Sequence, residues 1–311
     1  MKELQFECSF CKNKHCKKVV TTFDHYSQTK TSIDIVECLN CGVSSLYPLP
    51  DQESHFSAYP TDTINPLLIS NSSGMKFIEI LYRFFHPYSV KWRRKRIQKE
   101  IGVGQLLDVG CRNGDFLQEM RRQLWNVVGI EQNPIQHNFA SKTLGLTVYQ
   151  DLSQLKGKHD KQFDVITFWH SLGHFLNPEQ ALYEALQLLR KDGCLIIALP
   201  NLLSMDFWIY KKYWVALDAP RRLFHISPVS IKKFIKRNGL KLVRRKVIPF
   251  DIYYNCLLSE KLLIENNSTK KTIKILYYFR AIFFAINLHI LSLSGTGSGM
   301  LYVLKQDFST K

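Results

Sequence analysis

The chain has 311 residues, of which 45% are hydrophobic and 22% are charged, a composition that suits one large globular domain with a smaller one. Lysine and arginine outnumber aspartate and glutamate by 42 to 26, and the formal charge of +16 favours anionic partners without choosing among nucleic acid, anionic lipid and phosphorylated substrates. The first residues contain no apolar stretch typical of a secretory signal, so we expect a cytoplasmic protein.

Two cysteine pairs with the spacing Cys-x-x-Cys mark the first 50 residues. The four cysteines are Cys8, Cys11, Cys38 and Cys41. In a cytoplasmic chain such pairs indicate metal ligands rather than disulfides, and four thiolates close a tetrahedral zinc site with no open position. Residues 1–50 are therefore predicted to form a zinc-ribbon-like module with a structural zinc ion. An exchange of His15 or Cys16 into the site is the alternative.

Residues 51–100 are expected to form a linker and leading helices. The stretch through Gly74 is polar and contains several Ser and Asn residues, which favours a linker. The basic run 91–96 falls on a predicted helix, and a solvated helix face is the simplest interpretation of it.

Residues 106–115 contain the most informative motif of the chain. The apolar run 106–109 predicts a buried parallel strand, Gly110 and Gly114 bound a tight turn, and residues 116–124 predict a helix. A dinucleotide fingerprint requires glycines spaced G-x-G-x-x-G, which this turn lacks. Asp108 and Asp115 would repel phosphates but suit a ligand with an ammonium group and a sulfonium centre. S-adenosylmethionine carries both.

A second apolar strand at 127–130 ends in Glu131, about 20 residues after the first turn, where an acid can accept hydrogen bonds from ribose hydroxyls. At this point the chain resembles the class I S-adenosylmethionine-dependent methyltransferases from about residue 101 to its end. The resemblance rests on the order and spacing of four segments, which are residues 106–114, 128–134, 163–174 and 188–201. It implies a doubly wound Rossmann-like α/β sheet with an antiparallel last strand over residues 101–311.

The resemblance also implies a set of cofactor contacts. The methionyl end would lie at Asp108, Gly110 and Gly114, the ribose at Glu131, and the adenine at Asp151 and Leu152. Three positions depart from the family pattern. They are Arg112 in place of the middle glycine, Gly173 in place of a Glu, and Arg222 in place of a His. A bulky residue at 112 restricts the backbone if that turn needs a positive φ.

Candidate catalytic residues follow the strand expected at 163–168. Methyl transfer needs an acceptor lone pair in line with the methyl group, and a base if the acceptor is a hydroxyl or an acidic carbon. His170 and His174 are the nearest titratable side chains, and a purely structural role in the following turn is the alternative for both.

An insertion at 202–226 is expected on the same rim of the sheet. It is similar to a segment that helps to build the acceptor pocket in a large subgroup of these enzymes. The similarity makes candidate substrate residues of Trp214, Asp218, Arg221 and His225. A packed lid with one internal ion pair is the alternative interpretation.

A second rim insertion is expected at 251–297, between the last two strands. Residues 273–293 are almost wholly apolar, and Lys270, Lys271 and Lys274 lie at their start. Their length would span a bilayer, but the chain must return at once to the sheet, so a helix lying in the membrane interface fits better. A buried contact in a homodimer or a lid helix is the alternative.

These features together predict a methyltransferase that uses S-adenosylmethionine, carries structural zinc and acts on an oxygen or carbon of a glycan- or lipid-linked small molecule. We expect an anionic membrane surface as a partner, which would place the protein at the inner face of the membrane. An RNA methyltransferase is less favoured, because no aromatic and basic stacking platform is visible. A catalytically silent cofactor-binding partner is the second alternative, motivated by Arg112 and Gly173.

Overall fold

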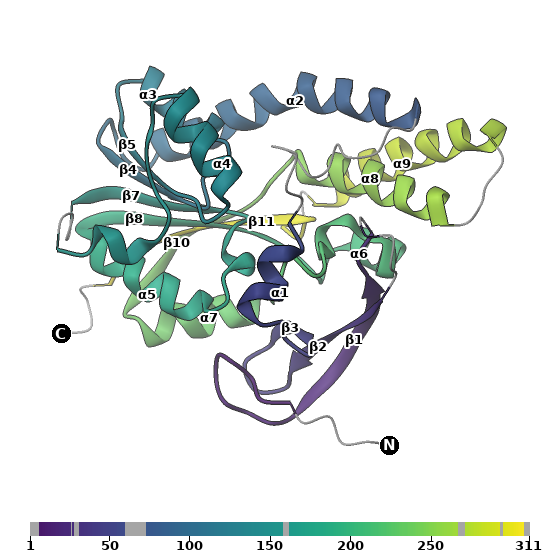
Figure 1. Cartoon of the computed structure of the whole chain (residues 1–311), viewed down its shortest axis with the longest axis horizontal. Helices are drawn as coiled ribbons and strands as arrows, with labels where there is room; N and C mark the ends of the chain where they lie inside the picture. The colour runs from purple at the N-terminus through teal and green to yellow at the C-terminus, as the bar shows by residue number, and fades with distance from the viewer. Residues whose placement is uncertain are drawn as a thin grey trace.

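The computed structural model describes residues 6–25, 27, 31–59, 73–157, 162–266, 271–292 and 295–307. Its centre is a seven-stranded sheet in the order β10-β11-β8-β7-β4-β5-β6 (Figure 1). The strands are β4 (Gln105–Val109), β5 (Asn126–Ile130), β6 (Thr147–Tyr149), β7 (Phe163–Trp169), β8 (Leu189–Pro200), β10 (Leu240–Val247) and β11 (Gly299–Gln306). β11 runs antiparallel to β8 and β10, whereas β4 to β8 pair in parallel. The expected doubly wound fold is confirmed.

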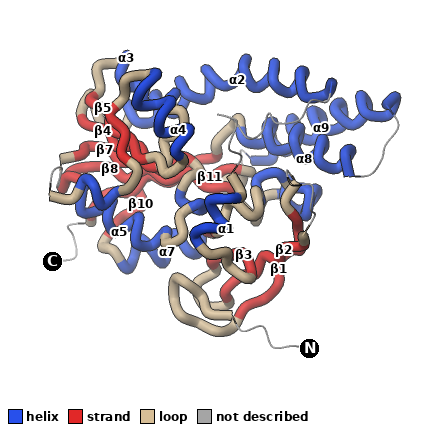
Figure 2. Tube along the Cα trace, in the orientation of Figure 1, coloured by secondary structure: helices blue, strands red, loops and turns tan. Residues whose placement is uncertain are grey.

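Both faces of this sheet are buried, because successive residues of a strand point to opposite faces. Leu107 packs in the core that α5 (Pro178–Leu188) and α7 (Pro228–Arg237) cover. Leu106 packs on the other face, against α2 (Ser73–Gln98) and α3 (Asp115–Arg122). The helices on the two sides of the red strands are visible in Figure 2. Continuous apolar strands are thus explained by burial on both sides.

A second sheet joins the N-terminal module to the first rim insertion. Its order is β1-β2-β3-β9, with β1 (Cys16–Phe23), β2 (Ser32–Cys38), β3 (Val43–Tyr47) and β9 (Phe224–Ile226). β9 belongs to the insertion at 202–226 and pairs antiparallel with β3. A strand of three residues has no periodicity to recognise in sequence, and we did not predict it. The cysteine module therefore shares its sheet with the catalytic domain.

Gly173 departs from the family pattern because β9 packs closely on the turn that contains it. The Leu223 amide donates a hydrogen bond of 2.8 Å to the carbonyl of Gly173. A Cβ at position 173 would lie 2.3 Å from the carbonyl oxygen of Phe224. A side chain at this position would push β9 off the turn, so the glycine is a packing requirement and not in itself a sign of lost activity.

The expected linker contains a short helix, α1 (Gln52–Ser57), before α2 begins. The helix predicted at 273–293 corresponds to α9 (Lys271–Ser292), which lies against α8 (Asp251–Asn266). In Figure 1 this pair projects from the edge of the sheet beside α2. Lys270 and residue 293 lie outside the described residues. Among the helices described, none combines the length and the hydropathy needed to cross a bilayer.

Candidate active site

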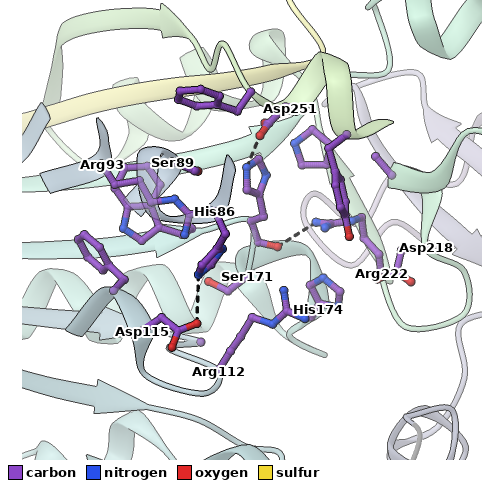
Figure 3. A pocket seen from close by; sticks show the side chains of 18 of the residues that line it. His86, Ser89, Arg93, Arg112, Asp115, Ser171, His174, Asp218, Arg222 and Asp251 are labelled. Atoms are coloured by element: carbon purple, nitrogen blue, oxygen red, sulfur yellow. Dashed lines mark hydrogen bonds and ion pairs between the residues drawn. The ribbon is translucent and has the colours of Figure 1, made fainter. Parts of the chain in front are cut away.

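A cavity of about 1040 Å³ opens at the carboxyl ends of β4, β5, β7 and β8. Open α/β sheets bind their ligands at this edge. The turns after the strands form one wall, α1 and α2 form a second, the 202–226 insertion a third, and α8 and α9 the last. Figure 3 shows how their polar side chains converge. The volume is sufficient for a cofactor and an acceptor together.

The turn after β4 needs backbone conformations that glycine adopts most easily. Gly110 has a φ of 79°, and a Cβ there would lie 2.3 Å from the Cβ of Ser171. Arg112 also has a positive φ, of 54°, although it is not glycine. Left-handed backbone costs such a residue roughly 1 to 2 kcal/mol. The Arg112 amide donates a hydrogen bond of 2.8 Å to the Oε2 of Glu131, so the strained turn still presents a donor toward the second strand.

Asp108 is a buried carboxylate facing the cavity. Its Oδ1 accepts a hydrogen bond of 2.7 Å from the Thr167 hydroxyl. Burial raises the pKa of Asp108 to about 7, against the opposing effects of Thr167 and Arg93. A buried carboxylate of raised pKa is stabilised most by a cationic ligand, because the cation offsets the free-energy cost of burying the negative charge.

Glu131 lines the cavity at the end of β5, where the sequence predicts a ribose ligand. Its Oε1 accepts from the Asn133 amide and its Oε2 from the Arg112 amide, each at 2.8 Å. Burial raises the pKa of Glu131, while these two hydrogen bonds oppose the rise. The two amides fix the carboxylate in one orientation and leave further lone pairs for a ligand.

Three of the expected cofactor residues do not line the cavity. Gly114 begins α3 with a φ of 83°, and a Cβ there would lie 2.6 Å from Leu146, so it permits helix–strand packing. Asp151 caps the short helix Leu152–Leu155 by accepting from the Ser153 amide. Leu152 is buried in the core. The ligand contacts expected for these residues remain predictions, and their observed roles are in backbone conformation, capping and packing.

Helix α2 contributes residues to the site that the sequence did not reveal. The Arg93 guanidinium stacks 5.1 Å from the ring centre of Trp169, which also lines the cavity. His86 Nε2 lies 3.1 Å from Asp115 Oδ2 (Figure 3). This contact is the first cause of the lowered pKa of Asp115. The basic run expected to form a solvated face thus sends Arg93 into the site.

His170 follows β7 with a φ of 59°, an uncommon conformation outside glycine. Its Nε2 lies 3.1 Å from Oδ2 of Asp251, the first residue of α8, as the dashed line from Asp251 marks in Figure 3. Arg222 holds the backbone by donating a hydrogen bond of 3.1 Å to the His170 carbonyl. A Cβ at Gly299 would lie 1.7 Å from Asp251 Oδ2, so that glycine leaves room for the carboxylate.

His174 is held in a different environment. Its Nδ1 lies 3.0 Å from both the Arg221 carbonyl and the Tyr59 hydroxyl. A carbonyl can only accept, so Nδ1 carries the hydrogen. Burial lowers the pKa of His174 far below its ordinary value, and Arg222 adds to the effect. His174 is therefore neutral near pH 7 and gains a proton much less readily than an ordinary histidine.

Arg221 connects the N-terminal module to the cavity wall. Its Nε donates to Asp218 at 2.8 Å, and its Nη1 lies 3.2 Å from Oδ1 of Asp24, which follows β1. The Arg221 carbonyl in turn accepts from His55 Nε2 at 2.9 Å. Arg221 and Asp218 both line the cavity, as the sequence predicts for substrate residues.

The other two predicted substrate residues do not reach the cavity. Trp214 is fully buried, and its indole donates a hydrogen bond of 2.6 Å to Asp206. His225 lies in β9 opposite Ser44, and burial lowers its pKa to about 3. Both side chains are buried inside the protein rather than exposed to the cavity. The sequence similarity identified the insertion at 202–226. It could not show which of its side chains face the core and which face the cavity.

The four predicted metal ligands lie together. The sulfur atoms of Cys8, Cys11, Cys38 and Cys41 are all within 4.8 Å of one another. The closest pairs, Cys8 with Cys41 and Cys11 with Cys38, are 3.5 Å apart, too far for a disulfide bond. Zinc–sulfur bonds of about 2.3 Å in a tetrahedron place the sulfur atoms about 3.8 Å apart, which this cluster fits. Cys16 does not belong to it.

Comparison with known proteins agrees with this fold. The family described as "Methyltransferase domain" matches residues 82–245, more than half of the chain. The chain belongs to this family and is an S-adenosylmethionine-dependent methyltransferase. A mycolic acid cyclopropane synthase solved with SAH and CTAB shares the fold, with a TM-score of 0.50 and 16% identity over 84% of this chain and 95% of that one.

Two curated relatives carry the name ubiquinone biosynthesis O-methyltransferase. The protein of Pelagibacter ubique is 27% identical over 190 residues, which cover 55% of this chain and 79% of the relative. That of Salmonella paratyphi A is 26% identical over 141 residues, or 42% of this chain. The match spans little more than half, 56%, of the Salmonella relative.

The residues present fit S-adenosylmethionine. Asp108 offers a buried carboxylate of raised pKa to a cation, and Glu131 offers oriented carboxylate oxygens to hydroxyl groups. Gly110 lines the same cavity, and its positive φ and close contact with Ser171 exclude a side chain at this position.

We predict that Asp108→Asn and Glu131→Gln each weaken S-adenosylmethionine binding by roughly tenfold or more, since a charge-assisted hydrogen bond is worth about 1.5 to 3 kcal/mol. Both changes keep the size of the side chain. Titration calorimetry measures the loss, and circular dichroism checks the fold. Asp192→Asn is the matched control, because Asp192 is an exposed acid of β8 that does not line the cavity, and it should bind normally. Native affinity in both cavity variants would contradict this assignment.

Proposed function

We propose that the protein methylates an oxygen atom of a small molecule that carries an apolar, lipid-like portion. One observation carries the proposal: a single cavity joins the cofactor residues to an apolar end. That end is lined by Phe250, Leu257, Ile282 and Ile286. A glycan alone would leave these side chains in contact with polar groups, whereas a lipid-linked acceptor covers them. The name O-methyltransferase of the curated relatives supports oxygen as the acceptor atom.

His170 is the proposed general base. When bound at Asp108 and Glu131, S-adenosylmethionine would supply the electrophilic methyl group. As the acceptor oxygen forms its bond to the methyl carbon, its proton must pass to a base. Orientation of Nε2–H toward Asp251 leaves Nδ1 of His170 with the free lone pair that takes this proton. Asp251 then stabilises the imidazolium.

His174 serves as a positioning residue in this scheme. The positive charges of Arg222 and Arg112 and its own burial disfavour an imidazolium at this site. Its hydrogen bond to the Arg221 carbonyl instead holds the wall that carries Asp218. Of the two histidines predicted as catalytic, the environment therefore favours His170 as base.

The direct test is to incubate the protein with methyl-labelled S-adenosylmethionine and fractionated cell extract. Label should appear in the organic-soluble fraction. His170→Asn should bind the cofactor with native affinity but transfer label about 100-fold more slowly, the usual range for loss of a general base. Asp251→Asn should slow transfer less and shift its pH profile, because it acts through His170.

Two outcomes would contradict the proposal. Label recovered in RNA would identify a nucleic-acid substrate. Tight cofactor binding with no label in any fraction would identify a catalytically silent protein. An unchanged rate in His170→Asn, with transfer intact, would remove His170 from the mechanism but leave the reaction standing.

We further propose that the cysteine cluster holds one structural zinc ion that supports the cavity wall. The second cysteine pair docks on α7, because the Ser230 hydroxyl donates a hydrogen bond of 3.0 Å to the Cys41 carbonyl. β3 begins two residues after Cys41 and pairs with β9, just beyond Arg221. A zinc ion bound to the four thiolates would therefore fix β3, and through it the insertion that forms the wall.

We predict that Cys38→Ser lowers zinc content and the melting temperature, because three remaining thiolates bind zinc more weakly. Elemental analysis and thermal unfolding measure the two effects. His15→Asn and Cys16→Ser are matched controls, since neither residue belongs to the cluster, and both should keep one zinc per chain. One zinc per chain in the Cys38→Ser protein would show that other residues bind the metal.

A further inference from the structure

Helix α9 exposes a continuous apolar stripe. Its members are Leu276, Phe279, Phe283, Ile286 and Ile290, each between 46% and 67% exposed. Their spacing alternates between three and four residues, so they lie on one face of the helix. The opposite face, with Ala281, Ala285 and Leu288, is buried. The stripe is therefore an outer surface and not an unfilled part of the core.

Helix α2 adds a second exposed apolar group, Phe84, Phe85 and Tyr88. Figure 1 shows α2 beside the α8–α9 pair, and residues of α2 and α9 line the same cavity. Phe85 of α2 and Ile286 of α9 each line the cavity and are also 46% exposed. The cavity thus reaches the surface between the two apolar groups. We call this surface, residues 84, 85, 88, 276, 279, 283, 286 and 290, the apolar portal.

The charges around the apolar portal suit an anionic partner. The part of α2 whose side chains are described, residues 83–98, carries six Lys or Arg residues and no acid. The described side chains of α9 include one such residue, Arg280, which pairs with Glu260 of α8. A second copy docked here would bring like charges together, whereas a surface of anionic lipid neutralises them. A second copy docked here would also cover the opening of the cavity.

We infer that the apolar portal docks on an anionic lipid bilayer and admits the acceptor from it into the cavity. α9 would lie in the interface plane with its stripe among the acyl chains, as an amphipathic helix does. The docking half of this inference stands on the exposed surface alone. The acceptor half rests on the proposed methylation of a lipid-linked oxygen.

Flotation tests the docking. The probes are vesicles of phosphatidylcholine with phosphatidylserine, and vesicles of phosphatidylcholine alone. The native chain should float with the anionic vesicles and less with the neutral ones, and added salt should reduce flotation. The double variant Phe279→Ser, Phe283→Ser should float roughly tenfold less, because it removes two large side chains from the stripe. Neither residue lines the cavity.

The matched control is the double variant Val103→Ser, Leu124→Ser. These two apolar side chains are also exposed, at 61% and 83%, but they precede β4 and β5 at the opposite edge of the sheet. The control should float like the native chain. No flotation of the native chain would overturn the inference. So would a native dimer that the stripe variant converts to monomer, since the stripe would then be an oligomer contact.

Supplying the acceptor either in detergent or in vesicles distinguishes failure of this inference from failure of the proposed function. With unmethylated organic extract dissolved in detergent as the acceptor, the Phe279→Ser, Phe283→Ser variant should transfer methyl at the native rate. With the same extract in anionic vesicles, its rate should fall in proportion to flotation. An equal loss of transfer rate with the acceptor in detergent and in vesicles would contradict entry of the acceptor through the apolar portal. If the native chain floats with anionic vesicles but transfers no label to lipid, membrane docking is supported. The proposal of a lipid-linked acceptor is then wrong.

Discussion

The cost of burying the Asp108 carboxylate constrains the whole cavity. Two hydrogen-bonded strands place this acid where the sheet opens, and burial raises its pKa to about 7 even with Thr167 as donor. A phosphate at this position would add a second negative charge, whereas an ammonium group offsets the first. The strained backbone at Arg112 and the two amides at Glu131 complete a site that selects a ligand by charge at one end and by hydroxyl groups at the other.

The acceptor side of the cavity depends on segments that are far apart in the chain. Arg221 joins Asp24 of the N-terminal module, Asp218 of the insertion and, through its carbonyl, His55 of α1. β9 adds the backbone pairing with β3. The cysteine cluster is therefore better understood as part of the wall than as a separate appendage. On the remaining side, α8 supplies Asp251 to His170 and α9 forms the apolar opening.

The sequence predicted the elements that repeat a simple pattern. The strand at 106–109, the helix expected at 116–124 and the apolar helix expected at 273–293 could be predicted, because burial of apolar faces leaves a local pattern in the sequence. The Cys-x-x-Cys spacing likewise identified the four cysteines that lie together. Contacts between distant segments left no such signal. Neither the pairing of β3 with β9 nor the approach of Asp251 to His170 follows from residue types, and whether Trp214 faces the cavity or the core depends on packing.

If the cavity binds S-adenosylmethionine, an ionised Asp108 receives the cationic end of the ligand. Calorimetry of S-adenosylmethionine binding at pH 7, in buffers of different ionisation enthalpy, measures the protons released on binding. Burial raises the pKa of Asp108 to about 7, so part of the population is protonated at that pH, and a bound cation drives it to the ionised form. We expect the native protein to release a fraction of a proton per site on binding. Asp108→Asn should release much less. Equal proton release and equal affinity in the two proteins would contradict the account.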